Sequence, residues 1–531
     1  MDAKADGGRW WQGATLYQIY VRSWRDTDAD GYGDLPGVIA GLDYLAWLGV
    51  DAIWLSPTVP SPDEDWGYDV SDYLGVHPDL GTLADMDKLI AEGGQRGIKV
   101  LLDLVPNHTS DAHAWFADAR SGAGSAHRDY YVWAGPVKGE GEAGGGPPNN
   151  WLDATGAPAW AMDGASGQYY LHNYLPGQPD LNWWDARVHE EFREIIRFWF
   201  DRGVAGFRID VAHGLYKDAL LRDNPPATSA SRLEGRFGQR PVYSANRPET
   251  HGVYRGWRRI ADGYTPRRLL LGETWVDLAA LASYYGQDDE LGLAFNFPFL
   301  FAGFEADALA GVVGETLARL PAGACPVWVA SNHDVSRFPT RWCGGDERKA
   351  RLALLVLATL PGTLTLYYGD EIAMPDVAVP GPLRRDKITP PGARSPGRDA
   401  ERTPMQWDAS PSAGFTAEGV TPWLPFGDNA VRNVAAQRDD PGSTLSLVRD
   451  LLALRRTAFA GQVVPYQRLP APPGVWSYRS GPLVVTANLT GHAVRLPGPP
   501  GEMLLTTGPA GEGRPSPGPW QGMVTRAPSC G

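Results

Sequence analysis

Eight short apolar segments, separated by amphipathic stretches, constrain the fold of this chain more than any other feature of its sequence. The segments are residues 16–21, 51–57, 99–105, 206–210, 269–274, 292–298, 326–332 and 364–369. The later segments are continuously apolar rather than alternating, as expected of strands buried on both faces of a sheet. Apolar residues recur at helical spacing in residues 35–49, 82–97, 186–203 and 346–360. Eight βα units predict an α/β fold, a parallel (β/α)8 TIM barrel.

Two stretches do not fit the βα repeat and predict additional domains. Residues 107–185 are rich in Gly, Pro, Asn and Trp and contain the strand-like GQYYLHNYL, which indicates a subdomain inserted after the third strand. Residues 457–531 follow a helical segment and contain short strand patterns, which predict a C-terminal antiparallel β-domain. The barrel is expected to comprise residues 1–106 and 186–456, with a long Pro- and Gly-rich loop at 373–430 over its mouth.

Charge and composition exclude several classes of partner. The net charge is −14, which disfavours binding to nucleic acid or to an anionic membrane surface. The N-terminus has no apolar signal segment, and no stretch reaches the length of a membrane span. The three cysteines form neither a disulfide framework nor a zinc pattern. We therefore expect a cytoplasmic protein with a small-molecule substrate, a monomer or weak homodimer, bound to neither nucleic acid nor membrane.

The stretch DTDADGYGD, residues 26–34, resembles the start of an EF-hand loop, but the rest of the EF-hand pattern fails. Position twelve is Gly37, where a bidentate Glu is required, and Pro36 would break an exiting helix. The stretch instead lies between a predicted strand and a predicted helix. Oxygen ligands at alternate positions still suit a hard cation. A solvated acidic turn is the alternative.

Polar residues follow four of the predicted strands. They are Asp103, Asn107 and His108 after the third strand, Arg208, Asp210 and His213 after the fourth, Glu273 after the fifth, and His333 and Asp334 after the seventh. In a parallel barrel these positions meet at the C-terminal face, where active sites lie. A single strand-end Asp is more often a helix cap or an ion-pair partner, but convergence of this whole set indicates a catalytic site.

Two carboxyl groups about 5 Å apart can cleave a glycosidic bond with retention, one as nucleophile and one as acid/base. Neighbouring barrel strands lie about 4.8 Å apart, so Asp210 and Glu273 satisfy that spacing. Arg208 faces the same side of its strand as Asp210 and would keep that carboxylate ionised. Glu273 would then have to be protonated at neutral pH. A hydrolytic metal site is disfavoured because no H-x-H or E-x-x-H cluster is present.

With these motifs in order, the sequence resembles the α-amylase family of glycoside hydrolases (family 13), specifically its α-glucosidase and oligo-1,6-glucosidase branch. The resemblance rests on GVDAIWLSP, DLVPNH, QPDLNWW, GFRIDVAHG, LGETW, SNHD and GTLTLYYGDE, with QPDLN and RTPMQWD marking the branch. It covers nearly the whole chain and is weakest in the last seventy residues. It implies a retaining, exo-acting α-glucosidase that releases glucose from the non-reducing end of short α-glucosides, with transglucosylation as a side reaction.

The resemblance also implies roles for individual residues. Asp210 would be the nucleophile, Glu273 the acid/base and Asp334 the transition-state stabiliser, with His108, Arg208 and His333 completing the glucose subsite and Tyr68 stacking on the sugar. Asp65 and Arg402 would form a pair that binds the terminal 4-hydroxyl and blocks further sugar. Tyr174 and Gln178 would line the aglycone side. Structural Ca²⁺, or Mg²⁺, would bind the side chains of Asp26, Asp28, Asp30 and Asp34 and the carbonyl of Tyr32; no organic cofactor is implied.

Linkage preference depends on a smaller signal. In the branch that the chain resembles, Val directly after the nucleophile accompanies cleavage of α-1,6 bonds, and Val211 occupies that position. The alternative is that Val is simply a good strand residue. Related activities also stay open: a glucosyl transferase or isomerase of the trehalose synthase or sucrose isomerase type, a hydrolase of phosphorylated disaccharides, and a catalytically inactive transporter partner. The last is disfavoured by the three carboxylates and the lack of an anchor.

Overall fold

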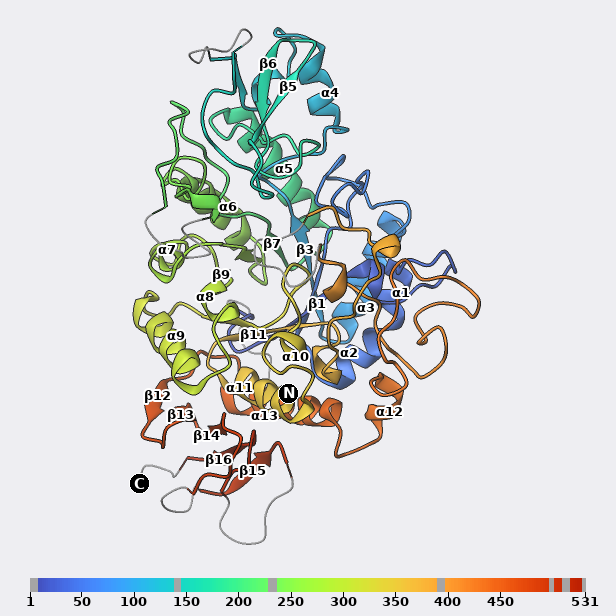
Figure 1. The fold of residues 1–531 in the computed structure, drawn as a ribbon, viewed down its shortest axis with the longest axis vertical. Helices are drawn as coiled ribbons and strands as arrows, with labels where there is room; N and C mark the ends of the chain where they lie inside the picture. The colour runs from blue at the N-terminus through green and yellow to red at the C-terminus, as the bar shows by residue number, and fades with distance from the viewer. Residues whose placement is uncertain are drawn as a thin grey trace.

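The structure, a computed structural model, describes residues 8–137, 145–227, 236–388, 397–495, 501–508 and 516–527. Parts of the predicted insertion (138–144), mouth loop (389–396) and C-terminal domain, as well as Cys530, lie outside these ranges. A central sheet occupies the middle of the molecule, with a small three-stranded unit at one end and a five-stranded sheet at the other (Figure 1). The long axis therefore runs through three regions, and the central one carries the strand ends singled out above.

The central sheet has eight strands in a nearly closed barrel, which confirms the predicted fold class. In spatial order they are β10 (Val327–Val329), β11 (Thr363–Tyr367), β1 (Thr15–Ile19), β2 (Ala52–Leu55), β3 (Lys99–Leu104), β7 (Gly206–Ile209), β8 (Leu269–Gly272) and β9 (Leu293–Ala294). Every pairing in this order is parallel. Inward side chains fill the barrel with a separate apolar cluster that includes Leu16, Trp54, Leu101, Leu271 and Val327. The barrel interior is thus packed, and substrate can bind only at an end.

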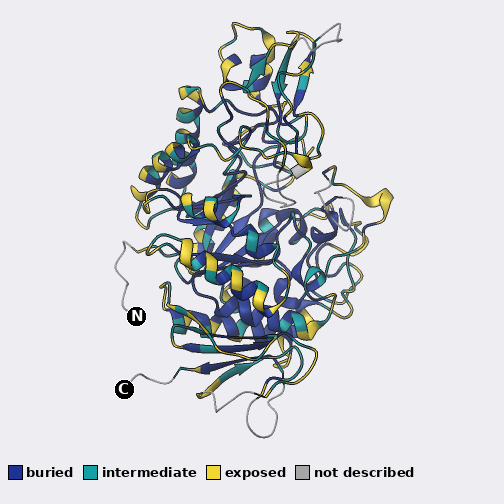
Figure 2. Cartoon of the chain, turned by 60° about the vertical axis from the view of Figure 1, so that its left-hand side comes forward, coloured by how far each residue is buried: buried dark blue, intermediate teal, exposed yellow. Residues whose placement is uncertain are grey.

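Helices surround the barrel, and α11 (Glu347–Thr359) is buried on all sides from Leu352 to Thr359. They are α1 (Leu35–Ala40), α2 (Leu42–Leu48), α3 (Leu83–Gln95), α5 (Ala186–Asp201), α6 (Thr250–Asp262), α7 (Leu278–Ser283), α8 (Phe297–Leu300), α9 (Ala306–Arg319), α10 (Phe338–Arg341), α11 (Glu347–Thr359), α12 (Val434–Arg438) and α13 (Thr444–Phe459). In α5, Asp185 caps the N-terminus by accepting from the Arg187 amide, and Phe192, Ile196 and Trp199 are buried. Figure 2 shows these buried faces directed at the central strands.

Predictions from local sequence patterns were wrong at two places. The stretch 35–49 is not one helix, because it divides at Gly41, where a Cβ would lie 2.7 Å from the Trp24 indole nitrogen. The stretch 292–298 is a strand only at Leu293–Ala294. Asn296 then accepts a hydrogen bond from the Phe299 amide and starts α8. The apolar spacing also did not single out α6 and α9.

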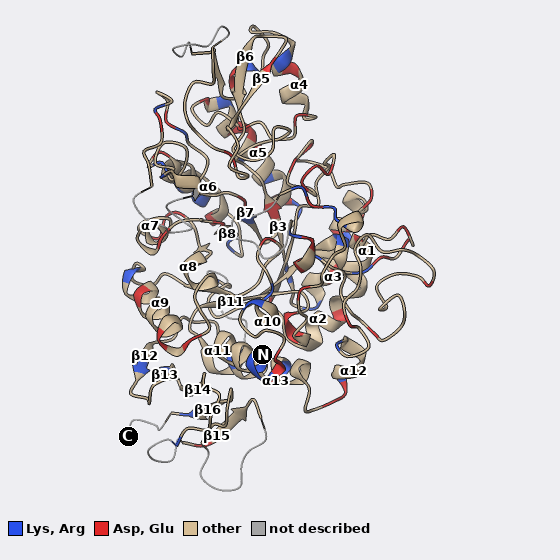
Figure 3. Cartoon of the chain, in the orientation of Figure 1, with Lys and Arg blue, Asp and Glu red and all other residues tan. Residues whose placement is uncertain are grey.

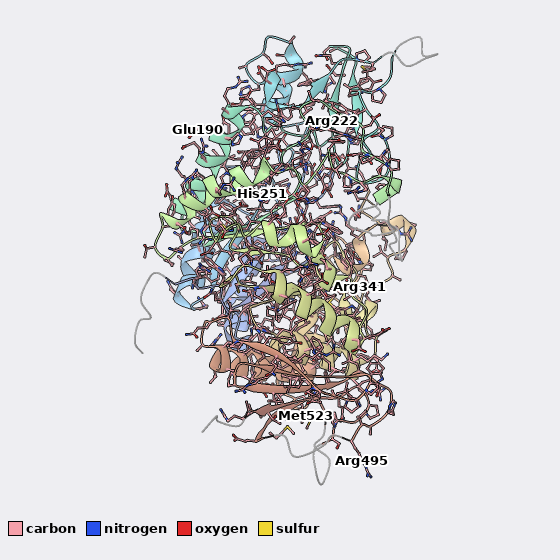
Figure 4. The ribbon with its side chains drawn as sticks, turned by 90° about the vertical axis from the view of Figure 1, so that its left-hand side faces the viewer. Glu190, Arg222, His251, Arg341, Arg495 and Met523 are labelled. Carbon is pink, nitrogen blue, oxygen red and sulfur yellow. The ribbon has the colours of Figure 1, made fainter. Side chains whose placement is uncertain are left out.

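The two smaller sheets lie at opposite ends of the molecule (Figure 1). The segment between β3 and α5 contains α4 (Ala114–Ser121) and a sheet of β4 (Trp133–Ala134), β6 (Gln168–Leu171) and β5 (Trp160–Asp163). The five-stranded antiparallel sheet contains β12 (Tyr466–Leu469), β13 (Val475–Ser480), β14 (Leu483–Asn488), β16 (Gly522–Arg526) and β15 (Met503–Thr506). Tyr478 of β13 hydrogen-bonds Thr359 of α11, and the buried Met523 of β16 is labelled in Figure 4. This sheet therefore packs on barrel helices far from the catalytic face.

Acidic and basic positions are interspersed over the molecule (Figure 3). In the described ranges, no helix combines the length and the apolar character needed to cross a lipid bilayer.

Candidate active site

The register of the barrel strands places the predicted catalytic residues side by side. In β3 and β7, Asp103 lies opposite Arg208, and in β7 and β8, Ile209 lies opposite Gly272. Asp210 and Glu273 directly follow these last two residues, so they leave adjacent strands at the same level. The Glu273 amide donates to the carbonyl of Ile209 at 2.9 Å, which continues the ladder past the strand ends.

Arg208 is the centre of the charged cluster. Its buried guanidinium donates to Asp103 Oδ1 at 2.9 Å and to Asp210 Oδ1 at 2.6 Å, and its Nη2 lies 2.7 Å from Glu273 Oε1. One guanidinium thus contacts three carboxyl groups. Arg208 and Asp210 lie on the same face because side chains two residues apart in an extended segment point to the same side. Three buried carboxylates against one cation leave excess negative charge, which favours uptake of a proton.

The protonation of this cluster follows from burial and from neighbouring charge. Burial raises the pKa of Asp103 to about 7, although Arg208 opposes that shift. Burial also raises the pKa of Asp210, and the Glu273 and Asp103 carboxylates add to it while Arg208 lowers it. For Asp334, burial alone would raise the pKa, but His333, Arg398 and Arg402 outweigh it and bring the pKa well below its usual value. Asp334 is therefore ionised at neutral pH, whereas burial favours the protonated forms of Asp103 and Asp210.

A small cavity of about 90 Å³ connects these carboxylates. Its lining contains seven of the predicted site residues: Asp65, Tyr68, His108, Tyr174, Asp210, Glu273 and Asp334. It also contains Ala154, His213, Trp275, Ile388 and Arg398. The structure therefore brings together residues from the segments that follow β2, β3, β7, β8, β10 and β11.

The aromatic and imidazole groups of the site are held by hydrogen bonds below the cavity. Tyr68 donates its hydroxyl to Asp103 at 3.0 Å, lies 2.6 Å from His333 Nε2 and stacks parallel to the His333 ring. Burial lowers the pKa of His333 well below its usual value, so the ring is neutral at pH 7. His108 is also fully buried, and burial lowers its pKa.

The predicted pairing of Asp65 with Arg402 is wrong. Arg398 is the cation that contacts Asp65, with Nη2 at 2.5 Å from Oδ1, and it also donates to Asp334 at 2.9 Å. Arg402 instead donates to the His333 carbonyl at 2.7 Å and to Asp334 at 3.0 Å. The two arginines lie one short helical turn apart, so the fold of the loop decides which one reaches Asp65. The sequence signal that could have identified Arg398 is the presence of another Arg four residues before Arg402, the first residue of the RTPMQWD motif.

Gln178 also lies elsewhere than predicted. Its side chain is fully buried, and its amide donates to Asp65 Oδ2 at 3.0 Å and lies 3.3 Å from His108 Nε2. Gln178 therefore supports the closed end of the sugar pocket instead of the aglycone side. Tyr174, by contrast, lines both this pocket and the larger cavity next to it.

Val211 has an unusual backbone. Its φ of 44° lies in the left-handed region, which a β-branched residue avoids. The strand β7 ends at Ile209, so the interpretation of Val211 as an ordinary strand residue is wrong. Its amide donates to Glu273 Oε2 at 3.0 Å, and Gly214 lies beneath its side chain. Backbone strain of about 1–3 kcal/mol persists where the surroundings enforce it, commonly at functional sites.

Trp275 is a site residue that belongs to the LGETW motif but was given no role from the sequence. Its indole N–H donates to Glu273 Oε1 at 3.0 Å, and its ring stacks on Phe297 at 4.1 Å. Together with the Val211 amide and Arg208, it fixes both oxygens of the Glu273 carboxyl. The sequence signal for it is its place at the end of the LGETW motif, two residues after Glu273.

The acidic loop lies between β1 and α1, as its sequence setting predicted. One carboxylate oxygen from each of Asp26, Asp28 and Asp34 lies within 4.8 Å of the others. Asp34 also caps α1 through the Gly37 amide, and Asp26 accepts from the Gly31 amide at 2.9 Å. Asp30 is exposed and accepts from the Tyr32 amide. Three clustered carboxylates make a donor set that fits a hard divalent cation.

Comparison with known proteins agrees with this geometry. Residues 18–461 match the family model of the alpha amylase catalytic domain. A probable alpha-glucosidase of Rhizobium meliloti (strain 1021) is 40% identical over 466 residues, 84% of this chain and 82% of its own. An oligo-1,6-glucosidase of Heyndrickxia coagulans is 34% identical over 94% of this chain and 95% of its own. The crystal structure of the alpha-glucosyl transfer enzyme XgtA superposes with a TM-score of 0.89 at 37% identity, over 97% of this chain and 99% of that one.

Proposed function

The chain belongs to the α-amylase family of glycoside hydrolases, and from that premise we propose that it is a retaining, exo-acting α-glucosidase. It releases glucose from the non-reducing end of short α-glucosides. The observation that carries the proposal is a pocket of about 90 Å³ lined both by Asp210 and Glu273 and by the Asp65–Arg398 ion pair. Alpha-glucosidases and an oligo-1,6-glucosidase among the relatives support the same activity.

The first chemical step uses both central carboxyl groups. The Asp210 carboxylate attacks C1 of the bound glucose, while Glu273 donates its proton to the leaving glycosidic oxygen. The bond from Arg208 to Asp210, at 2.6 Å, favours the charged nucleophile. The Trp275 indole and the Val211 amide each donate a hydrogen bond to the Glu273 carboxyl and so orient it for the transfer. Both groups contact the same guanidinium, which supports the short separation of a retaining pair.

The second step reverses these roles. Glu273, now ionised, takes a proton from water or from a sugar hydroxyl, whose oxygen attacks C1 and releases Asp210. Asp334 would bind hydroxyls of the distorted glucose and stabilise the positive charge at its ring, which its lowered pKa supports. His108 and His333 would add neutral hydrogen-bonding groups, and Tyr68 would cover the sugar face.

The ion pair at the closed end accounts for the exo mode of action. Arg398 and Asp65 are both buried and lie beside Asp334. A chain continuing beyond the terminal glucose would have to displace this pair and leave two charges unpaired, which costs several kcal/mol. The enzyme would therefore accept only one glucose unit on the non-reducing side.

We also propose a structural cation in the loop after β1. The carboxylates of Asp26, Asp28 and Asp34, with Asp30 and the Tyr32 carbonyl, would hold Ca²⁺ or Mg²⁺. When bound, the ion would neutralise the clustered charge and hold the loop against the segment near Thr416, which already donates to Asp26. The catalytic steps above do not involve it.

Glucosyl transfer is the second candidate function. It uses the same intermediate and differs only in whether water or another hydroxyl captures it. Its support is the similarity to the alpha-glucosyl transfer enzyme XgtA, together with a cavity of about 340 Å³ beside the sugar pocket. We further propose that the enzyme is a monomer or weak homodimer and acts in the cytoplasm; free, buried Cys325 and Cys343 support the reducing location.

The test is release of glucose from maltose, isomaltose, sucrose and trehalose, with Asp210→Asn as the matched inactive variant. We expect glucose from maltose or isomaltose and its loss in Asp210→Asn, because the amide cannot form the ester intermediate. Activity that survives in Asp210→Asn would refute the assigned nucleophile. Rearrangement of sucrose or maltose without net glucose release would favour the second candidate.

A further inference from the structure

We propose that Gln18 is a positioning residue for the catalytic step, because the hydrogen bond from its amide to Nδ1 of His333 fixes the tautomer of that imidazole. His333 then directs its Nε2–H toward Asp334, the carboxylate that would stabilise the transition state. The inference rests on the proposed function, and it adds to the site a side chain that lies outside the linings of both cavities.

Gln18 lies in β1 with its side chain inside the barrel. Leu16, two residues earlier, belongs to the apolar cluster that fills the barrel, and Gln18 points to the same side of the strand. The Gln18 side chain is fully buried, and its Nε2 is 2.7 Å from Nδ1 of His333, which is 315 residues away in the sequence. Neither residue lines the sugar pocket. Gln18 can therefore act on the reaction only through the groups that lie between it and the sugar.

The protons of the neighbouring groups determine the tautomer of His333. Asp103 accepts from Arg208 and from the Trp54 indole, and Tyr68 donates its single hydroxyl proton to the same carboxyl at 3.0 Å. The Tyr68 oxygen lies 2.6 Å from His333 Nε2, so it has to accept there, and Nε2 carries the ring proton. Burial lowers the pKa of His333 well below its usual value, so the ring is neutral. A neutral imidazole has one N–H, and Nδ1 is therefore an acceptor that needs a donor.

The other atom of the Gln18 amide shows why a polar side chain stands at this position. Oε1 is buried and has no hydrogen-bond partner among the residues that the structure describes. If the amide were turned over, Oε1 would face the Nδ1 lone pair of His333, so this contact decides which way round the amide lies. An apolar side chain of similar length would fill the same space without burying an unpaired oxygen. The bond to His333 is thus what accounts for an amide in the barrel interior.

The tautomer affects catalysis because His333 Nε2 also lies 3.2 Å from Asp334 Oδ2. Arg398 and Arg402 both donate to the other oxygen, Oδ1, at 2.9 and 3.0 Å. Within the described ranges, the His333 ring is the side chain that holds Oδ2. With the opposite tautomer a nitrogen lone pair would face this carboxylate and repel it. Gln18 therefore helps to keep Asp334 in the orientation in which it would meet the positive charge that develops on the glucose.

The charged groups around the His333 ring come from several elements. They are three cations and one carboxylate: Arg208, Arg398, Arg402 and Asp334. The arginines stay charged, and although burial opposes the shift, neighbouring His and Arg groups hold the pKa of Asp334 well below its usual value. Burial raises the pKa of the Tyr68 phenol well above its usual value. Burial raises the pKa of Asp103, one hydrogen bond beyond Tyr68, to about 7, but this titration is present in every variant and cancels in a comparison with wild type.

Nitrogen NMR of the wild-type enzyme tests the tautomer without reference to activity. The enzyme is labelled with nitrogen-15 at its histidines, and the His333 signals are those that disappear in His333→Asn. We expect Nε2 to carry the proton and Nδ1 to carry none at a pH above the pKa of Asp103, where that carboxylate accepts from Tyr68. A proton on Nδ1 would overturn the inference, whatever the kinetics of the variants.

Two substitutions of Gln18 separate positioning from packing. Gln18→Met keeps the length of the side chain and removes the donor, so kcat for maltose should fall about tenfold relative to wild type at every pH, with little change in KM. Gln18→Glu keeps Nε2–H on His333 only while the introduced carboxyl and the ring share a second proton. Its kcat should therefore approach wild type at acid pH and fall about tenfold below wild type as rising pH removes that proton, because the remaining ring proton then moves to Nδ1 to face the carboxylate. Leu16→Met, a volume-conserving change on the same strand, should leave the pH profile unchanged.

The outcomes separate this inference from the proposed function. Equal, pH-independent losses of kcat in Gln18→Met and Gln18→Glu would give Gln18 a merely structural role and overturn the inference. Wild-type kcat in Gln18→Met would overturn it as well. If thermal unfolding shows that neither variant folds, the NMR signals of the wild-type ring decide. Failure of the wild-type enzyme to turn over any α-glucosyl donor would overturn the proposed function, and with it the catalytic part of the inference, while the measured tautomer would stand.

Discussion

Replacement of Arg398 by lysine tests the closed end of the sugar pocket. Arg398 donates to Asp65 at 2.5 Å, to Asp334 at 2.9 Å and to Asp386 at 2.7 Å, and it is 6% exposed. A lysine keeps the positive charge but has one nitrogen in place of three. It can therefore hold one of these carboxylates closely, and the other two lose a charged hydrogen bond.

The magnitude follows from the number of bonds lost. A hydrogen bond to a charged group contributes about 1.5–3 kcal/mol, and each 1.36 kcal/mol corresponds to a tenfold change in rate. Asp65 and Asp334 are the partners proposed to touch the sugar, whereas Asp386 supports the loop. Loss of one sugar-facing bond predicts a fall in kcat/KM for maltose of about ten- to a hundredfold. Arg398→Ala, which leaves buried carboxylates unpaired, should also lower the free energy of unfolding by about 3–5 kcal/mol.

The assay is steady-state hydrolysis of maltose, and of a maltooligosaccharide blocked at its non-reducing end, alongside thermal unfolding. Arg402→Lys is the matched control, because Arg402 contacts Asp334 and the His333 carbonyl but is not the partner of Asp65. Arg398→Ala should gain measurable cleavage of the blocked substrate, and Arg402→Lys should not. Wild-type kcat/KM in Arg398→Lys, or opening of the pocket only by the Arg402 change, would refute the reasoning.

Three further predictions concern single contacts. Val211→Ala or Thr should lower the isomaltose-to-maltose rate ratio, measured with both sugars under identical conditions; an unchanged ratio would contradict a role in linkage preference. Chelation of divalent cations should lower the melting temperature and leave turnover at 25 °C nearly unchanged, and Asp26→Asn should remove the stabilisation by added Ca²⁺. Abolished activity with an intact fold would instead give the ion a catalytic role. Trp275→Phe keeps the ring but loses the 3.0 Å bond to Glu273, so kcat should fall about fivefold; unchanged kcat would exclude a positioning role.

The arrangement of the barrel could be predicted because its signals are local. Eight apolar runs and the helices between them depend on side-chain period and burial over a few residues. Strand ends in a parallel barrel meet at one face by necessity, so the sequence already indicated that Asp210 and Glu273 lie on adjacent strands. In the structure these two residues follow adjacent strands, and both carboxyl groups contact the Arg208 guanidinium. One local signal failed where a tertiary contact intervened, at Gly41 beneath Trp24.

The details of specificity depended on contacts between distant segments. Asp65 and Arg398 are 333 residues apart, and Arg402 has the same charge and a similar setting in the sequence. The left-handed backbone of Val211 and the packing of the Phe237 ring against Gly156 do not follow from any periodic pattern in the sequence either. The sequence by itself determined the barrel and the residues available for chemistry, because these follow from short-range spacing. Only the tertiary structure decided which arginine closes the sugar pocket and which side chains line the larger cavity beside it. Those outcomes depend on how separate loops pack at the barrel mouth.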